Sequence, residues 1–181
     1  MNKEETMLED EIYNTSDQDS RNEARHLTKL YNSTEPEEKE ERIHIITKLF
    51  AKVGEKFEIE PPFHCDYGTN IEIGENFYAN FNFLILDDGI VKIGYNALIG
   101  PNVSIFTSAH PTDPELRKQT HYHTKAITIG NNVWIGGGSI INPGVTIGDN
   151  SVIGSGSVVI KDIPENVVAV GNPCRIIKII D

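Results

Sequence analysis

The sequence predicts an all-β solenoid, a parallel β-helix whose sides are six residues long. Between Ile129 and Lys161 an aliphatic side chain returns at every sixth residue: Ile129, Ile135, Ile141, Ile147, Ile153 and Val159. A glycine or asparagine follows each of the first five, and a small or β-branched residue comes four positions after each aliphatic. A fixed period of six matches neither the helical period of 3.6 nor a hairpin array, and sustained fixed periods are typical of solenoids.

The same phase continues towards the N-terminus in two further runs: Ile93, Ile99 and Ile105, and Ile73, Ala79 and Ile85. The spacing from Ile85 to Ile93 is longer than six, so we expect two residues to bulge out around Asp87 to Gly89. A longer interruption leaves an excursion loop of about residues 106–126 outside the coil.

The first and fifth positions of a hexad share a parity and therefore face the same side of a strand, which we expect to be the core. The residue after each aliphatic is expected to supply a positive φ or a close backbone approach.

The first 56 residues are predicted to form a helical cap, which would cover the exposed strand edges at the open end of the solenoid. One helix, capped by Ser16 or Asp17, should run to about Tyr31, and a second should enter near Pro36 and end near Gly54. The expected buried stripes are Ala24, Leu27, Leu30 and Tyr31 on the first helix, and Ile43, Ile46, Phe50 and Val53 on the second. The β-helix should then occupy residues 57–170, and residues 171–181 should form a C-terminal tail.

Composition excludes several classes of function. The net charge is −11 and the pI about 4.9, which argues against a general nucleic-acid or anionic-membrane surface. No apolar run approaches the roughly 18 residues of a membrane span, and the N-terminus lacks the hydrophobic region of a signal peptide, so we expect a cytoplasmic protein. Cys65 and Cys174 have no metal-ligand spacing and are expected to be small buried hydrophobes in a reducing compartment.

Candidate chemistry lies outside the solenoid core. His110, in the excursion loop, carries an imidazole whose pKa suits proton transfer near neutral pH, although a loop histidine can also have no role. Asn80 occupies a corner position otherwise held mainly by glycine; it could tolerate a positive φ there or donate to an oxyanion. Asp66 and Asp88 could accept hydrogen bonds from sugar hydroxyls or be ordinary turn residues. Trp134, at an outward position, could contact a ligand or a second subunit.

Two further histidines raise the possibility of a metal site. His121 and His123 stand two residues apart, a spacing that allows both to bind one zinc ion. The sequence offers no matching third ligand. We therefore predict no metal.

Four motifs together resemble the sugar O-acetyltransferases of the hexapeptide superfamily, which include the maltose and galactoside O-acetyltransferases and the nodulation acetyltransferases. They are Asn76-Phe77-Tyr78-Ala79-Asn80-Phe81-Asn82, Leu86-Asp87-Asp88, Ser108-Ala109-His110-Pro111 and Ile129-Gly130-Asn131-Asn132-Val133-Trp134-Ile135-Gly136. The similarity extends from about Met7 to Ile180. It implies a left-handed β-helix that forms a homotrimer, with acetyl-CoA as the donor and a sugar hydroxyl as the acceptor.

The resemblance also assigns roles by position. His110 matches the general base and Asn80 the group that stabilises the oxyanion. Asp66 and Asp88 match positions that contact the acceptor, although galactoside enzymes carry serine where this chain has Asp66. Six residues match the CoA groove: Gly137, Ser155, Ile160, Lys161, Arg175 and Lys178. Ile160 and Lys178 depart from the threonine and arginine of some members.

The implied reaction is direct acetyl transfer in a ternary complex, because neither cysteine is placed to form a covalent intermediate. The active sites should lie between neighbouring subunits, with the excursion loop reaching across. Asp66 favours maltose or glucose over galactosides, because an ionised carboxylate binds hydroxyls more strongly than serine does; the segment near Tyr13 also influences this preference. Two alternatives remain: an acetyltransferase with an amine acceptor, and a non-catalytic scaffold, which loss of His110 or Asn80 would favour.

Overall fold

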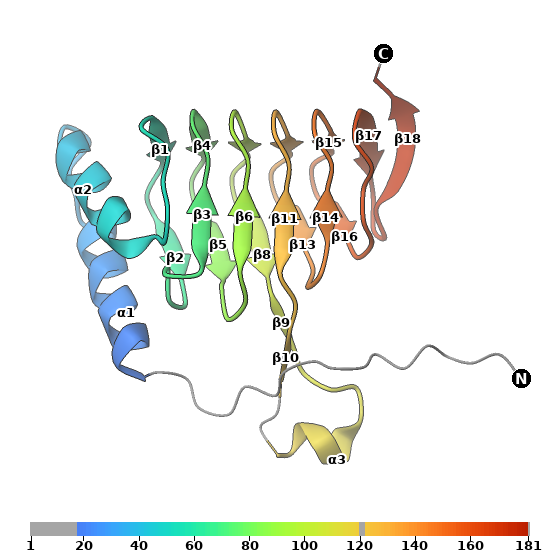
Figure 1. Cartoon of the computed structure of the whole chain (residues 1–181), viewed down its shortest axis with the longest axis horizontal. Helices are drawn as coiled ribbons and strands as arrows, with labels where there is room; N and C mark the ends of the chain where they lie inside the picture. Colours follow the sequence, from blue (N-terminus) through green and yellow to red (C-terminus); the bar gives the residue numbers. More distant parts are fainter. Residues whose placement is uncertain (1–17, 120–121, 181) are drawn as a thin grey trace, which may run out of the picture.

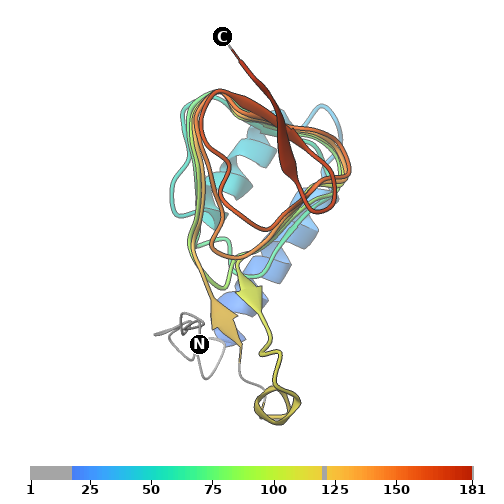
Figure 2. The same cartoon turned by 90° about the vertical axis from the view of Figure 1, so that its right-hand side faces the viewer.

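The computed structural model describes residues 18–119 and 122–180 and confirms the predicted left-handed parallel β-helix with its helical cap (Figure 1). Three parallel sheets form the sides of a prism, which Figure 2 shows end-on. Sheet I contains β1 (Phe57–Ile59), β4 (Phe77–Ala79), β7 (Leu98–Ile99), β12 (Trp134–Ile135), β15 (Val152–Ile153) and β17 (Val167–Val170). Sheet II contains β2 (Phe63–Cys65), β5 (Phe83–Leu86), β8 (Ser104–Phe106), β13 (Ile140–Ile141) and β16 (Val158–Val159). Sheet III contains β3 (Ile71–Ile73), β6 (Val91–Ile93), β11 (Ile127–Ile129) and β14 (Thr146–Ile147).

The hexad repeat sets the register of the sheets. Equivalent aliphatic residues of successive coils pair directly, as Ile73, Ile93, Ile129 and Ile147 do in sheet III. The residues at the first and fifth hexad positions are buried, as predicted, and together they form a continuous core along the axis. Near the cap this core is aromatic: Phe50 packs edge-on against Phe63, with ring centroids 5.5 Å apart.

Two different residues of each corner provide the positive φ and the close backbone approach, both of which the sequence predicted for the residue directly after the aliphatic. The positive φ falls two residues later, on asparagines such as Asn132 (φ 55) and on glycines such as Gly138 (φ 71). The glycine directly after the aliphatic permits close approach of the next coil instead. At Gly148, for example, a Cβ atom would lie 2.4 Å from the backbone nitrogen of Glu165.

The Gly148→Ala substitution is therefore expected to lower the free energy of unfolding by about 1–3 kcal/mol, because the added methyl group meets only backbone atoms. The matched control is Gly138→Asn, which places asparagine in the column where Asn82 and Asn102 already adopt a positive φ. No heavy atom lies closer than 4.0 Å to a Cβ at Gly138, so its effect should stay within about 0.5 kcal/mol. Urea unfolding of both variants checks this, and equal stabilities would contradict it.

One corner carries a column of hydrogen-bonded asparagines between sheets III and I. The Nδ2 atom of each side chain except the last donates to the Oδ1 atom of the asparagine in the next coil, over 2.8–3.1 Å. The column consists of Asn76, Asn96, Asn132, Asn150 and Asn166. We call it the asparagine column.

Two helices cover the N-terminal end of the solenoid (Figure 1). Helix α1 (Gln18–Asn32) buries Ala24, Leu27 and Tyr31 as predicted, but Leu30 is 44% exposed and Thr28 is buried instead. The hydroxyl of Tyr31 donates to the carbonyl oxygen of Ile59. The side chain of Asn32 bonds both the N–H and the carbonyl of Phe63, each at 2.8 Å, so α1 is fixed to β2. The predicted N-cap residues Ser16 and Asp17, and Tyr13, lie outside the described residues.

Helix α2 (Lys39–Leu49) ends earlier than predicted. Phe50 has an extended backbone, and the N–H of Ala51 donates to the carbonyl oxygen of Ile71 over 3.0 Å, so the chain joins the edge of sheet III before Val53. The buried stripe of α2 consequently consists of Ile45, Ile46 and Leu49. Ile43, which the sequence placed in that stripe, is 45% exposed.

The remaining elements lie at the C-terminal end and in the excursion loop. Strand β18 (Arg175–Ile179) pairs antiparallel with β17. The loop leaves the side of the solenoid through β9 (Ser108–Ala109), reaches α3 (Pro114–Arg117) at its tip and returns through β10 (His123–Thr124), which pairs antiparallel with β9 (Figure 1). Among residues 18–119 and 122–180, none of the helices has the length and apolar character of a membrane span.

The two cysteines pack as the sequence predicted. Cys174 is buried, and Cys65 is partly buried against the core. Burial raises the pKa of both thiols, so both are held in the unreactive protonated form.

Candidate active site

A polar cleft opens at the corner between sheets II and III, where the excursion loop leaves the solenoid. Its volume is about 490 Å³, and its lining includes Asp66, Asp88 and His110. Asp66 follows β2, Asp88 follows the last residue of β5 by two positions, and His110 follows the extension of β8. These three strands are neighbours in sheet II, so their carboxyl ends meet at one edge. The structure thus brings together the two residues predicted to contact the acceptor and the one predicted to take its proton.

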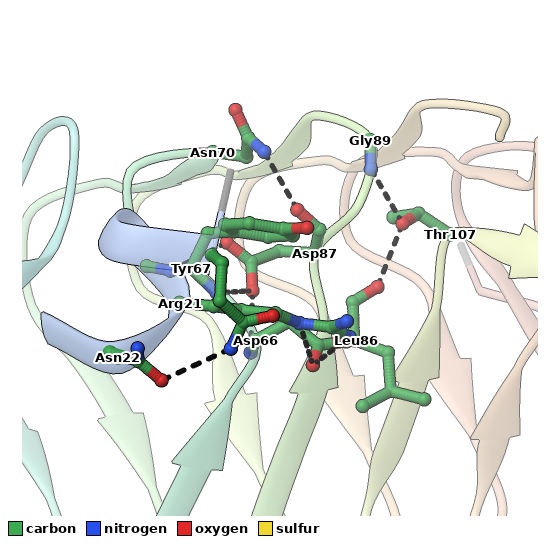
Figure 3. A network of polar contacts seen from close by, with 11 residues as sticks. Arg21, Asn22, Asp66, Tyr67, Asn70, Leu86, Asp87, Gly89 and Thr107 are labelled. Carbon is green, nitrogen blue, oxygen red and sulfur yellow. Dashed lines mark hydrogen bonds and ion pairs between the residues drawn. The ribbon is translucent and has the colours of Figure 1, made fainter. Parts of the chain in front are cut away.

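Arg21, on α1, is a lining residue that the sequence did not predict. Its Nη2 atom lies 2.6 Å from Oδ1 of Asp66, and its guanidinium carbon lies 5.3 Å from the centre of the Tyr67 ring (Figure 3). Burial lowers the pKa of Arg21, but the hydrogen bond and charge of Asp66 outweigh this, so its pKa is raised overall. On the sequence Arg21 is one of several charges on the polar face of a helix, and no pattern distinguished it. The cap therefore contributes directly to the cleft.

Two tyrosines stand beside the carboxylates. Burial raises the pKa of Tyr122, and the charge of Asp88 and a hydrogen bond to that carboxylate act in the same direction. Burial also raises the pKa of Tyr67, although the charge of Arg21 opposes the change. Both phenols are therefore neutral, and the cleft combines two carboxylates, one guanidinium and aromatic rings. Such a surface suits a ligand with many hydroxyl groups.

His110 also lines a second, more apolar cleft of about 410 Å³, with His123, Lys125 and Pro143 among its lining residues. The loop is held in shape there by Arg117, whose Nη1 atom donates to the carbonyl oxygen of Pro111 over 2.9 Å. The part of the chain that the structure describes holds no group of three metal-ligating side chains, and His121 lies outside it. His110 and its neighbour Ala109 thus line both of two spaces that could hold two reactants, and His110 is the one of the pair with a side chain that can transfer a proton.

Asn80 does not line either cleft. It follows β4, at the corner between sheets I and II, whereas His110 leaves from the opposite edge of sheet II. Its Oδ1 atom accepts a hydrogen bond from the N–H of Phe81 over 2.8 Å. Asn80 does not adopt a positive φ, so tolerance of that conformation does not explain why asparagine stands where the next three coils carry Gly100, Gly136 and Gly154.

The six residues assigned to a CoA groove fall into three groups. Gly137 and Ser155 lie at the corner of Asn80, in successive coils. Ile160 and Lys161 follow β16, at the corner of the excursion loop, and Arg175 and Lys178 belong to β18. Trp134 points outward from sheet I and is 52% exposed. A single chain therefore distributes these residues over two edges of the prism and its C-terminal strand.

Family models match two parts of the chain. The model described as a bacterial transferase hexapeptide of six repeats matches residues 126–161, and the maltose acetyltransferase hexapeptide capping motif matches residues 6–54. The first lies on the later coils of the solenoid, and the second spans the two helices of the cap.

Known proteins resemble the chain over most of its length. Galactoside O-acetyltransferase of Escherichia coli (strain K12) is 54% identical over 148 residues, which cover 82% of this chain and 73% of the relative. A solved galactoside acetyltransferase in complex with coenzyme A has a TM-score of 0.89 and 54% identity, covering 91% of this chain and 82% of that one. A maltose O-acetyltransferase from Clostridium difficile 630 has a TM-score of 0.89 and 51% identity, covering 90% of this chain and 87% of that one.

Proposed function

The chain belongs to the hexapeptide-repeat acetyltransferases of the galactoside and maltose O-acetyltransferase type, and from this membership we propose that it transfers the acetyl group of acetyl-CoA to a sugar hydroxyl. One observation supports this assignment above the others: His110 lies in one cleft with the carboxylates of Asp66 and Asp88. A base beside hydrogen-bond acceptors for hydroxyl groups is the arrangement that O-acylation of a sugar requires.

The proposed donor is acetyl-CoA, and the related galactoside acetyltransferase bound to coenzyme A supports it. We propose that Gly137, Ser155, Ile160, Lys161, Arg175 and Lys178 line the groove for the CoA moiety. Lys161, Arg175 and Lys178 would supply positive charge for the phosphates in an otherwise acidic protein.

In the proposed mechanism, an imidazole nitrogen of His110 takes the proton of the acceptor hydroxyl as the oxygen attacks the thioester carbonyl carbon. The carbonyl oxygen becomes an oxyanion, which accepts a hydrogen bond from the Nδ2 group of Asn80. The tetrahedral intermediate then collapses, the bond from carbon to sulfur breaks, and the thiolate of CoA receives the proton from the imidazolium. Holding both substrates in one complex supplies a large part of the acceleration.

We propose that this site is shared between subunits of a homotrimer. Asn80 and His110 lie at opposite edges of sheet II, so a neighbouring copy could bring the two residues to one interface. The outward side chains support the same assembly. Sheet III presents polar residues such as Glu72 and Lys92, whereas sheet I presents Leu98 and Trp134, both about half exposed. Burying these apolar side chains around a three-fold axis gives a closed assembly.

The acceptor is tested by acetyl-CoA turnover with maltose, glucose, galactosides, amino sugars and no acceptor. We expect release of CoA with a hydroxyl acceptor and retention of the product ester under neutral conditions. Turnover with amino sugars alone would indicate an amine acceptor. Absence of turnover with every acceptor would contradict the proposed function.

Within this panel, maltose and glucose are expected to outperform galactosides. Arg21 binds Oδ1 of Asp66, so we expect an acceptor hydroxyl to meet Oδ2 of the same carboxylate. The Asp66→Ser substitution should lower the ratio of kcat/KM for maltose to that for a β-galactoside by about five- to 150-fold, which corresponds to about 1–3 kcal/mol.

Asp66→Asn is the matched control, because it keeps the shape of the side chain and removes the charge that pairs with Arg21. A lower ratio of kcat/KM for maltose to that for the β-galactoside in both variants would show that the charge sets the preference. A lower ratio in Asp66→Ser alone would show that the hydrogen bond sets it. Galactosides leading in the wild type, or a ratio unmoved by Asp66→Ser, would rule out Asp66 as the determinant.

A further inference from the structure

We propose that Asp87 and Thr107, two fully buried polar residues, are positioning residues that hold the acceptor carboxylates and the His110 loop in one geometry. The inference rests on the proposed function, because it assigns Asp66, Asp88 and His110 to a single reaction. Neither side chain is among the residues that line the cleft, and both are buried at the corner between sheets II and III, where Figure 3 shows them in one polar network with Asp66 and Leu86. We refer to Asp87 and Thr107 as the buried pair.

Asp87 organises the turn that carries Asp66. The sequence predicted that two residues bulge out around Asp87 to Gly89, yet the side chain of Asp87 is turned inward and fully buried. Its Oδ1 atom accepts hydrogen bonds from the N–H groups of Asp66 at 2.9 Å and Tyr67 at 3.0 Å, and Oδ2 accepts from Gly68 at 2.7 Å. Three successive backbone amides thus enclose one carboxylate. The turn of Asp66 cannot move without breaking these bonds.

Thr107, in the next coil, fixes the segment that carries Asp88. Its hydroxyl donates to the carbonyl oxygen of Leu86 over 2.7 Å and accepts from the N–H of Gly89 over 2.8 Å. These two contacts hold both ends of the segment that contains Asp87 and Asp88. The carbonyl oxygen of Thr107 also accepts from the N–H of Lys125 over 2.8 Å, which closes the neck of the excursion loop. His110 stands three residues beyond that neck.

The chemistry of Asp87 argues against a role in stability alone. Burial raises the pKa of its carboxyl group, whereas the backbone hydrogen bonds of Tyr67, Asp66 and Gly68 act in the opposite direction. Burying a carboxylate is costly unless it is fully hydrogen-bonded, and regular corners of this solenoid are filled instead by uncharged residues such as Val145 and Ser151. The charged group occurs at the corner where two acceptor carboxylates and the loop must be aligned.

Thr107→Val and Thr107→Ser provide a matched test, because valine keeps the shape of threonine without its hydroxyl, and serine keeps the hydroxyl. Removing the hydroxyl leaves the partly buried N–H of Gly89 and carbonyl of Leu86 without this partner. In Thr107→Val we expect kcat/KM for the sugar to fall by about tenfold, while KM for acetyl-CoA stays within about twofold of the wild type. Amide hydrogen exchange at Gly89 should become faster, and Thr107→Ser should restore both properties.

The control for a general loss of packing is Ser151→Ala. Ser151 is also fully buried, and its hydroxyl donates to the carbonyl oxygen of Pro164 over 2.7 Å, at the corner that carries the asparagine column. Ser151→Ala should lower the thermal midpoint as Thr107→Val does, but leave kcat/KM for the sugar unchanged. Equal kinetic losses in Thr107→Val and Ser151→Ala, or equal rises in KM for sugar and for acetyl-CoA, would overturn the proposal.

A failure of the proposed function and a failure of the positioning role give different results. A wild-type protein that acetylates no sugar would refute the proposed function, and the alignment of a sugar site by the buried pair would fall with it. An active wild type whose Thr107→Val variant exchanges Gly89 faster but keeps its kcat/KM would refute only the positioning role. Asp87→Asn gives a second measurement, since an amide cannot accept from all three N–H groups. Exchange at Asp66, Tyr67 and Gly68 should become faster in that variant, and unchanged protection would overturn the role of Asp87.

Discussion

Replacement of His110 by alanine is expected to lower kcat by about 10²- to 10⁴-fold, the usual contribution of a general acid–base group. A sugar hydroxyl is a weak nucleophile until its proton is removed, and among the described residues that line the polar cleft His110 alone carries an imidazole. The variant should fold as the wild type does, because His110 lies in the excursion loop and the solenoid core does not include it. Steady-state turnover of acetyl-CoA with a saturating sugar acceptor measures the effect.

His26→Ala is the matched control, because His26 is exposed on α1 and does not line either cleft. It should retain the activity of the wild type. Added imidazole should partly restore turnover to His110→Ala, as expected when only the proton acceptor is missing. Near-full turnover of His110→Ala at neutral pH would show that another group removes the proton.

The Asn80→Ala substitution is expected to lower kcat by about 10²- to 10³-fold, the effect of removing one hydrogen-bond donor from an oxyanion. KM for the sugar should change little, because the hydrogen bond strengthens only as charge develops on the carbonyl oxygen. The positive-φ explanation does not apply to Asn80, so a purely conformational role would have to act through the hydrogen bond to Phe81. An unchanged kcat would return Asn80 to such a structural role.

Mixed trimers test whether Asn80 and His110 of different subunits form one site. Once sedimentation equilibrium has shown the trimer, the His110→Ala and Asn80→Ala chains are unfolded together, refolded and assayed. Under random assembly each mixed trimer contains one interface with both native residues, so activity should return to about a quarter of the wild-type level. If both residues of a site came from one chain, no combination of the two inactive chains would restore activity.

The solenoid could be predicted because its signal is local and repeated. The residue pattern of each hexad, such as Ile129 to Trp134, predicts one strand and one corner by itself. One irregular hexad therefore does not change the positions predicted for the others. The same reasoning placed Asp88 and His110 at interruptions of the repeat, and both meet Asp66, which the family resemblance assigned to the acceptor, at one edge of sheet II. Departures from a regular pattern thus indicated where the cleft lies.

What could not be predicted depends on contacts between distant segments. Nothing in the helical pattern of α1 distinguishes Arg21 from its charged neighbours, because its partner Asp66 stands 45 residues away. The eight-residue spacing before Ile93 indicated an irregular corner, but only the folded chain shows that Asp87 turns inward. The early end of α2 has the same origin, since pairing of Ala51 with Ile71 overrides the helical periodicity.

The asparagine column makes the stability of the protein sensitive to slow deamidation. The four hydrogen bonds of the column all run in one direction, from each coil to the coil that follows. Every side-chain amide between the two ends of the column therefore both donates and accepts a hydrogen bond. Asparagine is among the residues lost to slow hydrolysis at high temperature. Deamidation at Asn132 would leave a carboxylate, which cannot donate, facing the amide oxygen of Asn150. Ageing of one exposed side chain would thus remove one hydrogen bond of the column, so the long-term stability of this solenoid depends on its surface as well as on its core.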